Sequence, residues 1–254
     1  MIKIFLRYSE EEILLINTGE KIFLWIEDKK DKSGYTFWKT FTEQLFPDVI
    51  VESKKNNSEL VKAVTKLEDK ENRYIVVFDN SFDNLQVLSE LKILTDASKE
   101  KDNVALLDIV CFEYLLLEFK ELIDWVFAPD DEFLEQRSST INARYKLVNA
   151  INNGDSSYKE IKEIKDYCDN IEDYNIEQLS AKILFELTRN TGFEVSKSSI
   201  GECWVRSCCD WYGRQDDDIC GLDNSRLDLY DKMKHILVGT CLSSEFRRLG
   251  LEVA

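Results

Sequence analysis

The sequence has few of the residues that build catalytic loops: its 254 residues include two prolines, nine glycines and one histidine. With so few glycines, the chain contains no glycine-rich loop of the kind that cradles phosphate groups. The single histidine, His235, belongs to no recognisable nucleophile triad. Two common classes of enzyme site are therefore absent as motifs.

Long apolar runs are missing as well. No segment approaches the roughly 20 apolar residues that a membrane helix requires. The opening segment, residues 1–7, lacks the basic start, apolar middle and small-residue cleavage site of a secretory signal. We therefore expect a cytoplasmic protein with no membrane partner. Its apolar residues, 44% of the chain, are sufficient for a buried core.

Positive charge is scarce. The chain has 33 Lys and Arg against 49 Asp and Glu, which gives a formal net charge of −16. Affinity for nucleic acids comes largely from basic side chains that neutralise phosphates, so this surface should repel a polyanion on average. A protein that acts on nucleic acid would need a local basic groove, divalent cations or a basic partner protein.

The first half of the chain alternates between strand-like and helix-like segments. Short runs rich in β-branched and aromatic residues predict strands, and apolar residues at helical spacing between them predict helices. The predicted strands are 21–26, 48–52, 74–78 and 104–110, and the predicted helices are 35–45, 58–67, 85–94 and 112–122. This alternation predicts an α/β fold: a mostly parallel sheet with flanking helices on both faces.

The second half changes character after Pro129, which lies in the acidic stretch 129–132. We predict an α/β domain over 1–129 and a mainly α-helical C-terminal domain over 130–254, with a Cys-rich segment at 203–220. The helices expected in this domain are 133–152, 158–171, 176–191 and 228–246.

Acidic residues follow two of the predicted strands. Glu27 comes directly after the first strand and Asp79 directly after the third, with Asp83 one short turn further on. Ligands of open α/β sheets bind beyond the carboxyl ends of the strands, and carboxylate oxygens suit magnesium. Acidic residues at strand ends are also common as turn formers and helix caps, and that interpretation stays open. One magnesium ion cannot join carboxylates of Glu27 and Asp79 that lie more than about 8 Å apart.

Three segments resemble a known family. The segment FLWIE (23–27), with Asp31 and the aromatic helix 35–41, is similar to the vEGxxD start of the Toprim family of primases, topoisomerases and OLD-type nucleases. The segment VVFDNSFDN (76–84) resembles its vvDxDxD strand end, and CFEYLLLEF (111–119) resembles a helix of RloB-like Toprim proteins from bacterial defence loci. Together the segments cover about half of the chain.

The resemblance implies a magnesium- or manganese-dependent nuclease that cleaves RNA or DNA. It also implies that the nuclease belongs to a bacterial antiviral defence system and that a partner protein controls it. Asp79 and Asp83 would hold the metal, and Glu27 would act as general base or share it. Lys29, Lys30 and Lys32 would attract the nucleic-acid backbone.

This chain departs from the family pattern at three positions, one of which is Glu118, where the RloB-like helix has histidine. Asp28 stands where the family usually has glycine, and Ser81 replaces the second aspartate of the Asp-x-Asp pair. The alternative function is therefore a non-catalytic Toprim-like module, or regulatory subunit, that binds a partner protein.

Four cysteines fall within 18 residues: Cys203, Cys208, Cys209 and Cys220. Four thiolates can hold zinc in a tetrahedron. The segment has no Cys-x-x-Cys pair, however, and cysteine also packs as a small buried apolar residue. Both interpretations, zinc ligands and simple packing, stay open.

Overall fold

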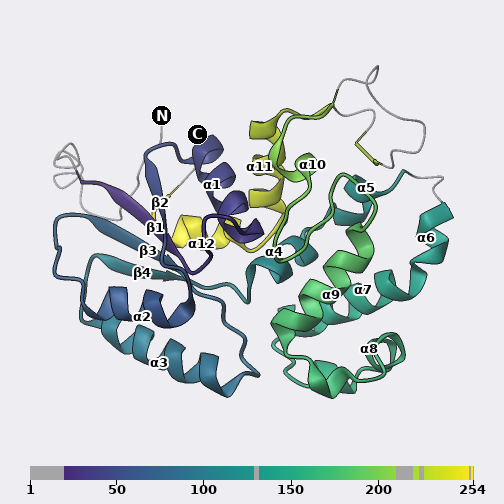
Figure 1. The fold of residues 1–254 in the computed structure, drawn as a ribbon, viewed down its shortest axis with the longest axis horizontal. Coiled ribbons are helices and arrows are strands. Elements are labelled where there is room, and N and C mark those ends of the chain that lie inside the picture. Colours follow the sequence, from purple (N-terminus) through teal and green to yellow (C-terminus); the bar gives the residue numbers. More distant parts are fainter. Residues whose placement is uncertain (1–19, 129–131, 210–219, 223–225, 252, 254) are drawn as a thin grey trace.

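A four-stranded, all-parallel sheet forms the first half of the protein (Figure 1). The computed structural model describes residues 20–128, 132–209, 220–222, 226–251 and 253. The strand order is β2-β1-β3-β4. The strands are β1 (Ile22–Ile26), β2 (Val49–Ser53), β3 (Arg73–Val77) and β4 (Val104–Leu107). The predicted α/β class is confirmed.

Both faces of the sheet are buried. In β1, Leu24 and Ile26 belong to the larger hydrophobic cluster, whereas Trp25 belongs to a second, smaller one. In β3, Ile75 and Val76 divide between the two clusters in the same way. Side chains alternate between the faces of a strand, so these apolar runs require helices on both sides of the sheet.

Helices cover the two faces as the sequence predicts. The α2 helix (Asn57–Thr65) and α3 (Leu85–Lys99) lie side by side and supply the smaller cluster, while α1 (Ser33–Leu45) supplies the larger one (Figure 1). The α1 helix buries a row of aromatic rings, among them Phe37, Trp38 and Phe41.

The rest of the described chain is mainly helical, in agreement with the predicted C-terminal part. Its helices are α4 (Phe112–Glu118), α5 (Leu122–Val126), α6 (Glu132–Gln136), α7 (Ser138–Asn152), α8 (Lys162–Tyr167), α9 (Ile176–Thr188), α10 (Glu202–Val205), α11 (Leu229–Gly239) and α12 (Leu242–Arg248), with 3-10 turns at Tyr158–Glu160 and Ile171–Asp173.

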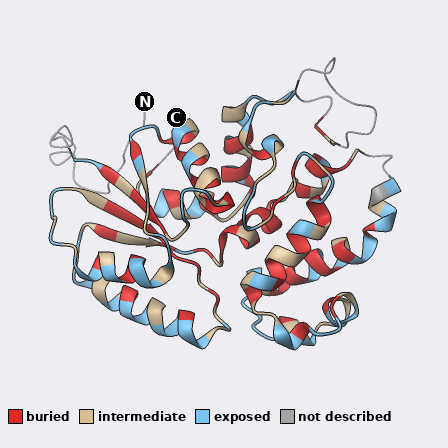
Figure 2. Ribbon diagram, in the orientation of Figure 1, coloured by how far each residue is buried: buried red, intermediate tan, exposed pale blue. Residues whose placement is uncertain are grey.

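The larger hydrophobic cluster runs through both halves of the chain. Phe246 of α12 stacks on Phe46, with 4.8 Å between the ring centroids, and also meets Phe41 of α1. Figure 2 shows the continuous band of buried residues that links the sheet to the helices. Pro129, the predicted domain boundary, lies outside the described residues, but the core itself extends from β1 to Leu251.

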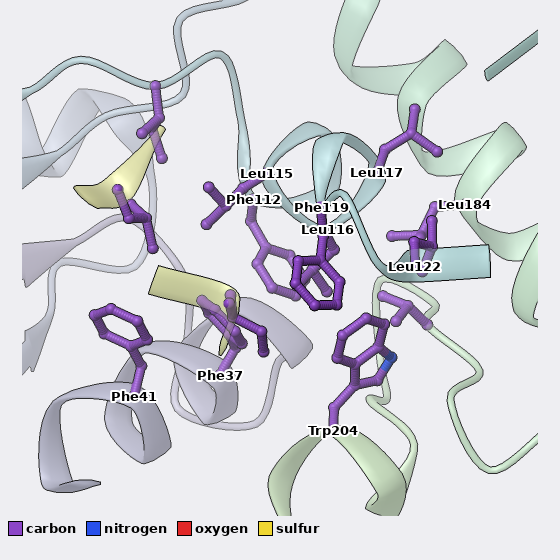
Figure 3. Packing of buried hydrophobic residues seen from close by; sticks show 14 of the residues in the cluster. Phe37, Phe41, Phe112, Leu115, Leu116, Leu117, Phe119, Leu122, Leu184 and Trp204 are labelled. Carbon is purple, nitrogen blue, oxygen red and sulfur yellow. The ribbon is translucent and has the colours of Figure 1, made fainter. Parts of the chain in front are cut away.

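Two predicted helices are interrupted at one contact. The segment 112–122 divides into α4 and α5 around Phe119, and the segment 228–246 divides into α11 and α12 after Gly239. A Cβ on Gly239 would lie 2.7 Å from the ring of Phe119, and the Lys120 amide donates to the Gly239 carbonyl. Figure 3 shows Phe119 among Phe37, Phe112 and Trp204 at this junction. Tertiary packing therefore decides where these helices break.

Within the described residues, no helix is long and apolar enough to span a membrane.

Candidate acidic site

Four elements bring carboxylates to the carboxyl edge of the sheet. Glu27 follows β1 directly and Asp79 lies just beyond β3, the strand that pairs with β1 in parallel register. Glu113 is in the first turn of α4, and Glu177 is in the first turn of α9. With Asp28, which follows Glu27, these residues influence one another electrostatically. We call Glu27, Asp28, Asp79, Glu113 and Glu177 the acidic cluster.

Glu27 and Asp79 form its centre. Their side chains are hydrogen-bonded to each other, which places them far inside the 8 Å limit for sharing one ion. Burial raises the pKa of Asp79 well above its usual value, and the negative charge of Glu27 raises it further. Burial also raises the pKa of Glu27 to about 7, although its bond with Asp79 partly opposes this. Of the two carboxyl groups, burial therefore favours the protonated form more strongly at Asp79.

The surrounding carboxylates are perturbed in the same direction. Burial raises the pKa of Glu113 to about 7, and the charges of Glu177, Asp28 and Glu27 add to the effect. Burial raises the pKa of Asp28 to about 6, and Glu177 again contributes. Burial and mutual repulsion both disfavour the charged forms. The cluster therefore holds more negative charge than its surroundings offset.

Few cations counter this charge. The exposed Lys197 lowers the pKa of both Glu27 and Asp28, and Lys32 lowers that of Asp28. Lys32 also lies 3.8 Å from Asp31, while Lys29 and Lys30 are exposed. Of the three lysines expected from the sequence, Lys32 thus reaches the cluster electrostatically, and Lys197 is an addition from a distant segment.

The structure places Asp83 in different surroundings. Its Oδ2 atom accepts a hydrogen bond from the Tyr158 hydroxyl at 2.7 Å and lies 3.7 Å from Lys159 Nζ. Its Oδ1 atom accepts from the backbone N–H of Ile176 at 3.1 Å, at the first residue of α9. A carboxylate is favoured at a helix N-terminus, where the backbone amides lack partners. Asp83 therefore anchors α9, which carries Glu177.

Asp28 and Ser81, two residues at which the sequence differs from the Toprim-like motifs, both have polar or close contacts at the site. Asp28 lies against the start of α1, where a Cβ on Gly34 would come within 2.0 Å of its Oδ2 atom. The glycine that permits a close approach here is thus Gly34 of α1, and it is not at the end of the strand. Ser81 is fully buried, and its hydroxyl donates to Glu177 Oε2 at 3.3 Å. The Ser81 hydroxyl thus contacts a carboxylate from α9 at the site.

Sequence reasoning missed Glu177. It follows Asn175, which forms a capping box with Gln178 at the start of α9. An acidic residue in a first turn is common for its favourable interaction with the helix dipole, so nothing in the pattern marks Glu177 as part of a site. The packing of α9 against α4 brings it to the cluster, together with the bonds that Asp83 and Ser81 make to the first turn of α9.

The acidic cluster has the chemistry of a cation site but not a closed ligand shell. Carboxylate oxygens are the ligands that magnesium and manganese take. Among the described residues, however, no three Asp, Glu, His or Cys side chains stand in an arrangement that could hold a metal ion.

The other three clustered cysteines lie near enough to Cys203 to influence it electrostatically. Cys208, Cys209 and Cys220 all contribute to the pKa of Cys203, which burial raises to about 11. Cys203, Cys208 and Cys220 are partly buried and Cys209 is exposed, so simple burial does not describe all four.

Comparison with known proteins identifies no relative: no family model, no curated protein and no solved structure matches the chain. The similarity to Toprim proteins therefore rests on the three sequence segments and stays a prediction.

Proposed function

We propose that the protein is a nuclease that depends on magnesium or manganese, with the acidic cluster as its active site. The observation that supports this most is the convergence of five carboxylates at the carboxyl edge of a parallel sheet, with raised pKa values at four of them. Such clusters of perturbed groups are uncommon outside functional sites. The same edge of the sheet is where open α/β proteins bind ligands.

A divalent cation suits the donor set. Glu27 and Asp79, with Glu113 or Asp28 beside them, would hold it, because a cation and a shared proton are alternative ways to offset the same repulsion. When bound, the ion would polarise a phosphate and stabilise the leaving oxygen.

The chain's own residues would divide the remaining work. With a pKa of about 7, Glu27 is suited to accept a proton from an attacking water near neutral pH. Lys197 stands exposed beside the carboxylates and would meet a phosphate oxygen. Asp83 would act indirectly, since it fixes the start of α9 and so the position of Glu177.

The excess of acidic residues, −16 overall, also bears on substrate capture. Because the average surface repels nucleic acid, binding should require the cation and a more basic partner protein. We propose that such a partner controls the enzyme, in a setting of bacterial antiviral defence, as the RloB-like resemblance implies.

The test is a cleavage assay with the full chain. Labelled single- and double-stranded RNA and DNA would be incubated with Mg²⁺, Mn²⁺ or chelator, with and without the product of the neighbouring gene. We expect metal-dependent cleavage by the wild type and by Glu43→Gln, an exposed carboxylate on α1. Glu27→Gln should be inactive. Equal activity or equal inactivity of wild type and Glu27→Gln under all conditions would refute the proposal.

A second function has one observation in its favour. The lack of a metal arrangement among the described side chains is also expected of a Toprim-like module that binds a partner without catalysis. Calorimetric titration with Mg²⁺ separates the two. A nuclease should bind the ion at pH 8 and lose that binding in Asp79→Asn, whereas a non-catalytic module should show no binding in either form.

A further inference from the structure

A groove lies beside the acidic cluster, at the same edge of the sheet. Its first part is a cavity of about 190 Å³ beyond the ends of β3 and β4, with Asn80 in its wall. Its second part is a hollow of about 270 Å³ with Phe82 in its wall. The two parts adjoin, because Val110 and Ile151 line both. We call them together the side groove.

The side groove is joined to the acidic cluster through β3 and the turn that follows it. Asn80 comes directly after Asp79 in the chain. Phe82 comes directly after Ser81, whose hydroxyl donates to Glu177 Oε2 at 3.3 Å. A molecule in the groove would therefore lie next to whatever the acidic cluster holds.

Asn80 carries an unsatisfied hydrogen-bonding group. Its Oδ1 atom is buried and accepts no hydrogen bond from any described residue. A buried oxygen without a partner is unfavourable, and a ligand is one way to satisfy it. The terminal torsion of asparagine is broad, so a small rotation presents the amide to the cavity. An asparagine amide pairs well with adenine, which offers an amino group as donor beside a ring nitrogen as acceptor.

Phe82 supplies an aromatic surface in the second part of the groove. Its ring is partly buried and meets Tyr158 edge to face, with 6.2 Å between the centroids and 87° between the planes. The Tyr158 hydroxyl donates to Asp83, which fixes this support. A cavity of about 150 Å³ already admits a benzene ring, and aromatic side chains stack with unpaired bases. This part of the groove therefore suits a flat ring.

The charge of the side groove selects against phosphate. Asp108, Glu118 and Asp155 stand in its walls, and no described lysine or arginine does. Carboxylates repel a phosphate but accept hydrogen bonds from the amino group of a neutral base. The phosphates of a bound strand would stay outside, on the side of Lys197 and the cation.

We propose that the side groove binds an unstacked adenine of a single-stranded RNA or DNA whose backbone lies at the acidic cluster. Asn80 would pair with the base, and Phe82 would stack with it. This inference rests on the proposed nuclease function and names its substrate class. A base inside a duplex is paired and stacked and cannot enter such a cavity, whereas a single strand can turn a base outward.

The first experiment measures binding of the base without catalysis. Adenosine, purine riboside and uridine would each be titrated into the full chain in metal-free buffer, followed by calorimetry and ligand-detected NMR. Adenosine should bind, and purine riboside, which lacks only the amino group, should bind about fivefold more weakly or worse. Uridine should bind more weakly than adenosine. Since these probes carry no phosphate and need no metal, the result does not depend on nuclease activity.

Variants assign the two contacts. Asn80→Ala should weaken adenosine binding by about tenfold and Phe82→Leu by about fivefold. The matched controls are Asn57→Ala, at another asparagine whose buried oxygen has no partner, and Phe185→Leu, at an exposed ring on α9. Neither control residue lines the groove, so both variants should bind adenosine as the wild type does.

A cleavage assay then separates this inference from the nuclease proposal. With Mg²⁺, single strands that contain adenine should be cut faster than oligouridine, and Asn80→Ala should lose that preference. Adenosine binding without cleavage of any strand would support the groove and refute the nuclease. Cleavage that ignores base identity, with no preference for adenosine over purine riboside, would refute the groove alone. Adenosine monophosphate that binds as tightly as an adenine oligonucleotide in Mg²⁺ would overturn the assignment to a strand.

Discussion

Asp79 and Asp83 are separated by a single turn, yet the structure treats them in opposite ways. Each oxygen of Asp83 accepts a hydrogen bond, from a tyrosine hydroxyl and from the first amide of α9. Asp79 is buried among other acids, and its pKa is raised well above the usual value. A fold satisfies the carboxylates that hold it together. One that it leaves repelled and protonated is better explained by a ligand that arrives later.

The contrast between Asp79 and Asp83 would be wrong if Asp79 were dispensable for activity. We expect Asp79→Asn to lower the rate of metal-dependent cleavage by roughly 10³-fold, since it removes a cation ligand and the partner of Glu27. Asp83→Asn should retain activity within about tenfold. Single-turnover cleavage rates measure both, and a larger loss in Asp83→Asn would reverse the assignment.

Substitutions at the same two positions should also differ in their effect on the free energy of unfolding. Here the larger loss is expected at Asp83. Asp83→Ala should lower the free energy of unfolding by about 3 kcal/mol, because it leaves the Tyr158 hydroxyl and the Ile176 amide without their acceptor. Asp79→Asn should cost less than about 1 kcal/mol in metal-free buffer at pH 8, since it replaces a buried acid, whose charged form the site disfavours, with a neutral amide of similar size. Urea denaturation followed by circular dichroism gives both values; a greater loss for Asp79→Asn would contradict the comparison.

Metal-free stability should fall as the pH rises. The folded state holds protons on Glu27 and Glu113 up to a pKa of about 7, while in the unfolded chain these groups ionise near 4.5. The stabilisation is therefore complete below about pH 4.5 and is lost as the pH rises through 7. We expect the midpoint of thermal unfolding to drop on the order of 5 °C between pH 5.5 and 8 in chelator.

Magnesium supplies the control for that prediction. Because it binds the ionised carboxylates, it should restore most of the loss at pH 8 and change little at pH 5.5. Differential scanning fluorimetry at both pH values measures this, and the same magnesium effect at both would argue against a cation site in the cluster.

The smallest expected effect concerns Lys197. Lys197→Ala removes a cation that favours ionised Glu27, so the pKa of Glu27 should rise by a few tenths of a unit. Carbon-detected NMR titration of the glutamate carboxyls would follow it. A fall in this pKa would mean that Lys197 does not act on Glu27 as the structure indicates.

The sequence predicts a site residue well where a single strand determines the position of its side chain. The apolar runs before Glu27 and Asp79 predict both strands, and parallel pairing then brings the two carboxylates together. It was uninformative for Glu177 and Lys197, because their positions depend on how distant segments pack. Asp83 is a third case. Its carboxylate is of the type that holds a metal ion, and in the structure it accepts a hydrogen bond from the first amide of α9.

The packing of α12 on α1 has a consequence for protein synthesis. Phe41 and Phe46 emerge early from the ribosome, but Phe246, which completes their aromatic stack, is among the last residues to be made. Glu177, too, is translated long after Glu27. A chain that ends before α9 therefore lacks one carboxylate of the acidic cluster, and a chain that ends before α12 lacks the ring that completes the aromatic stack.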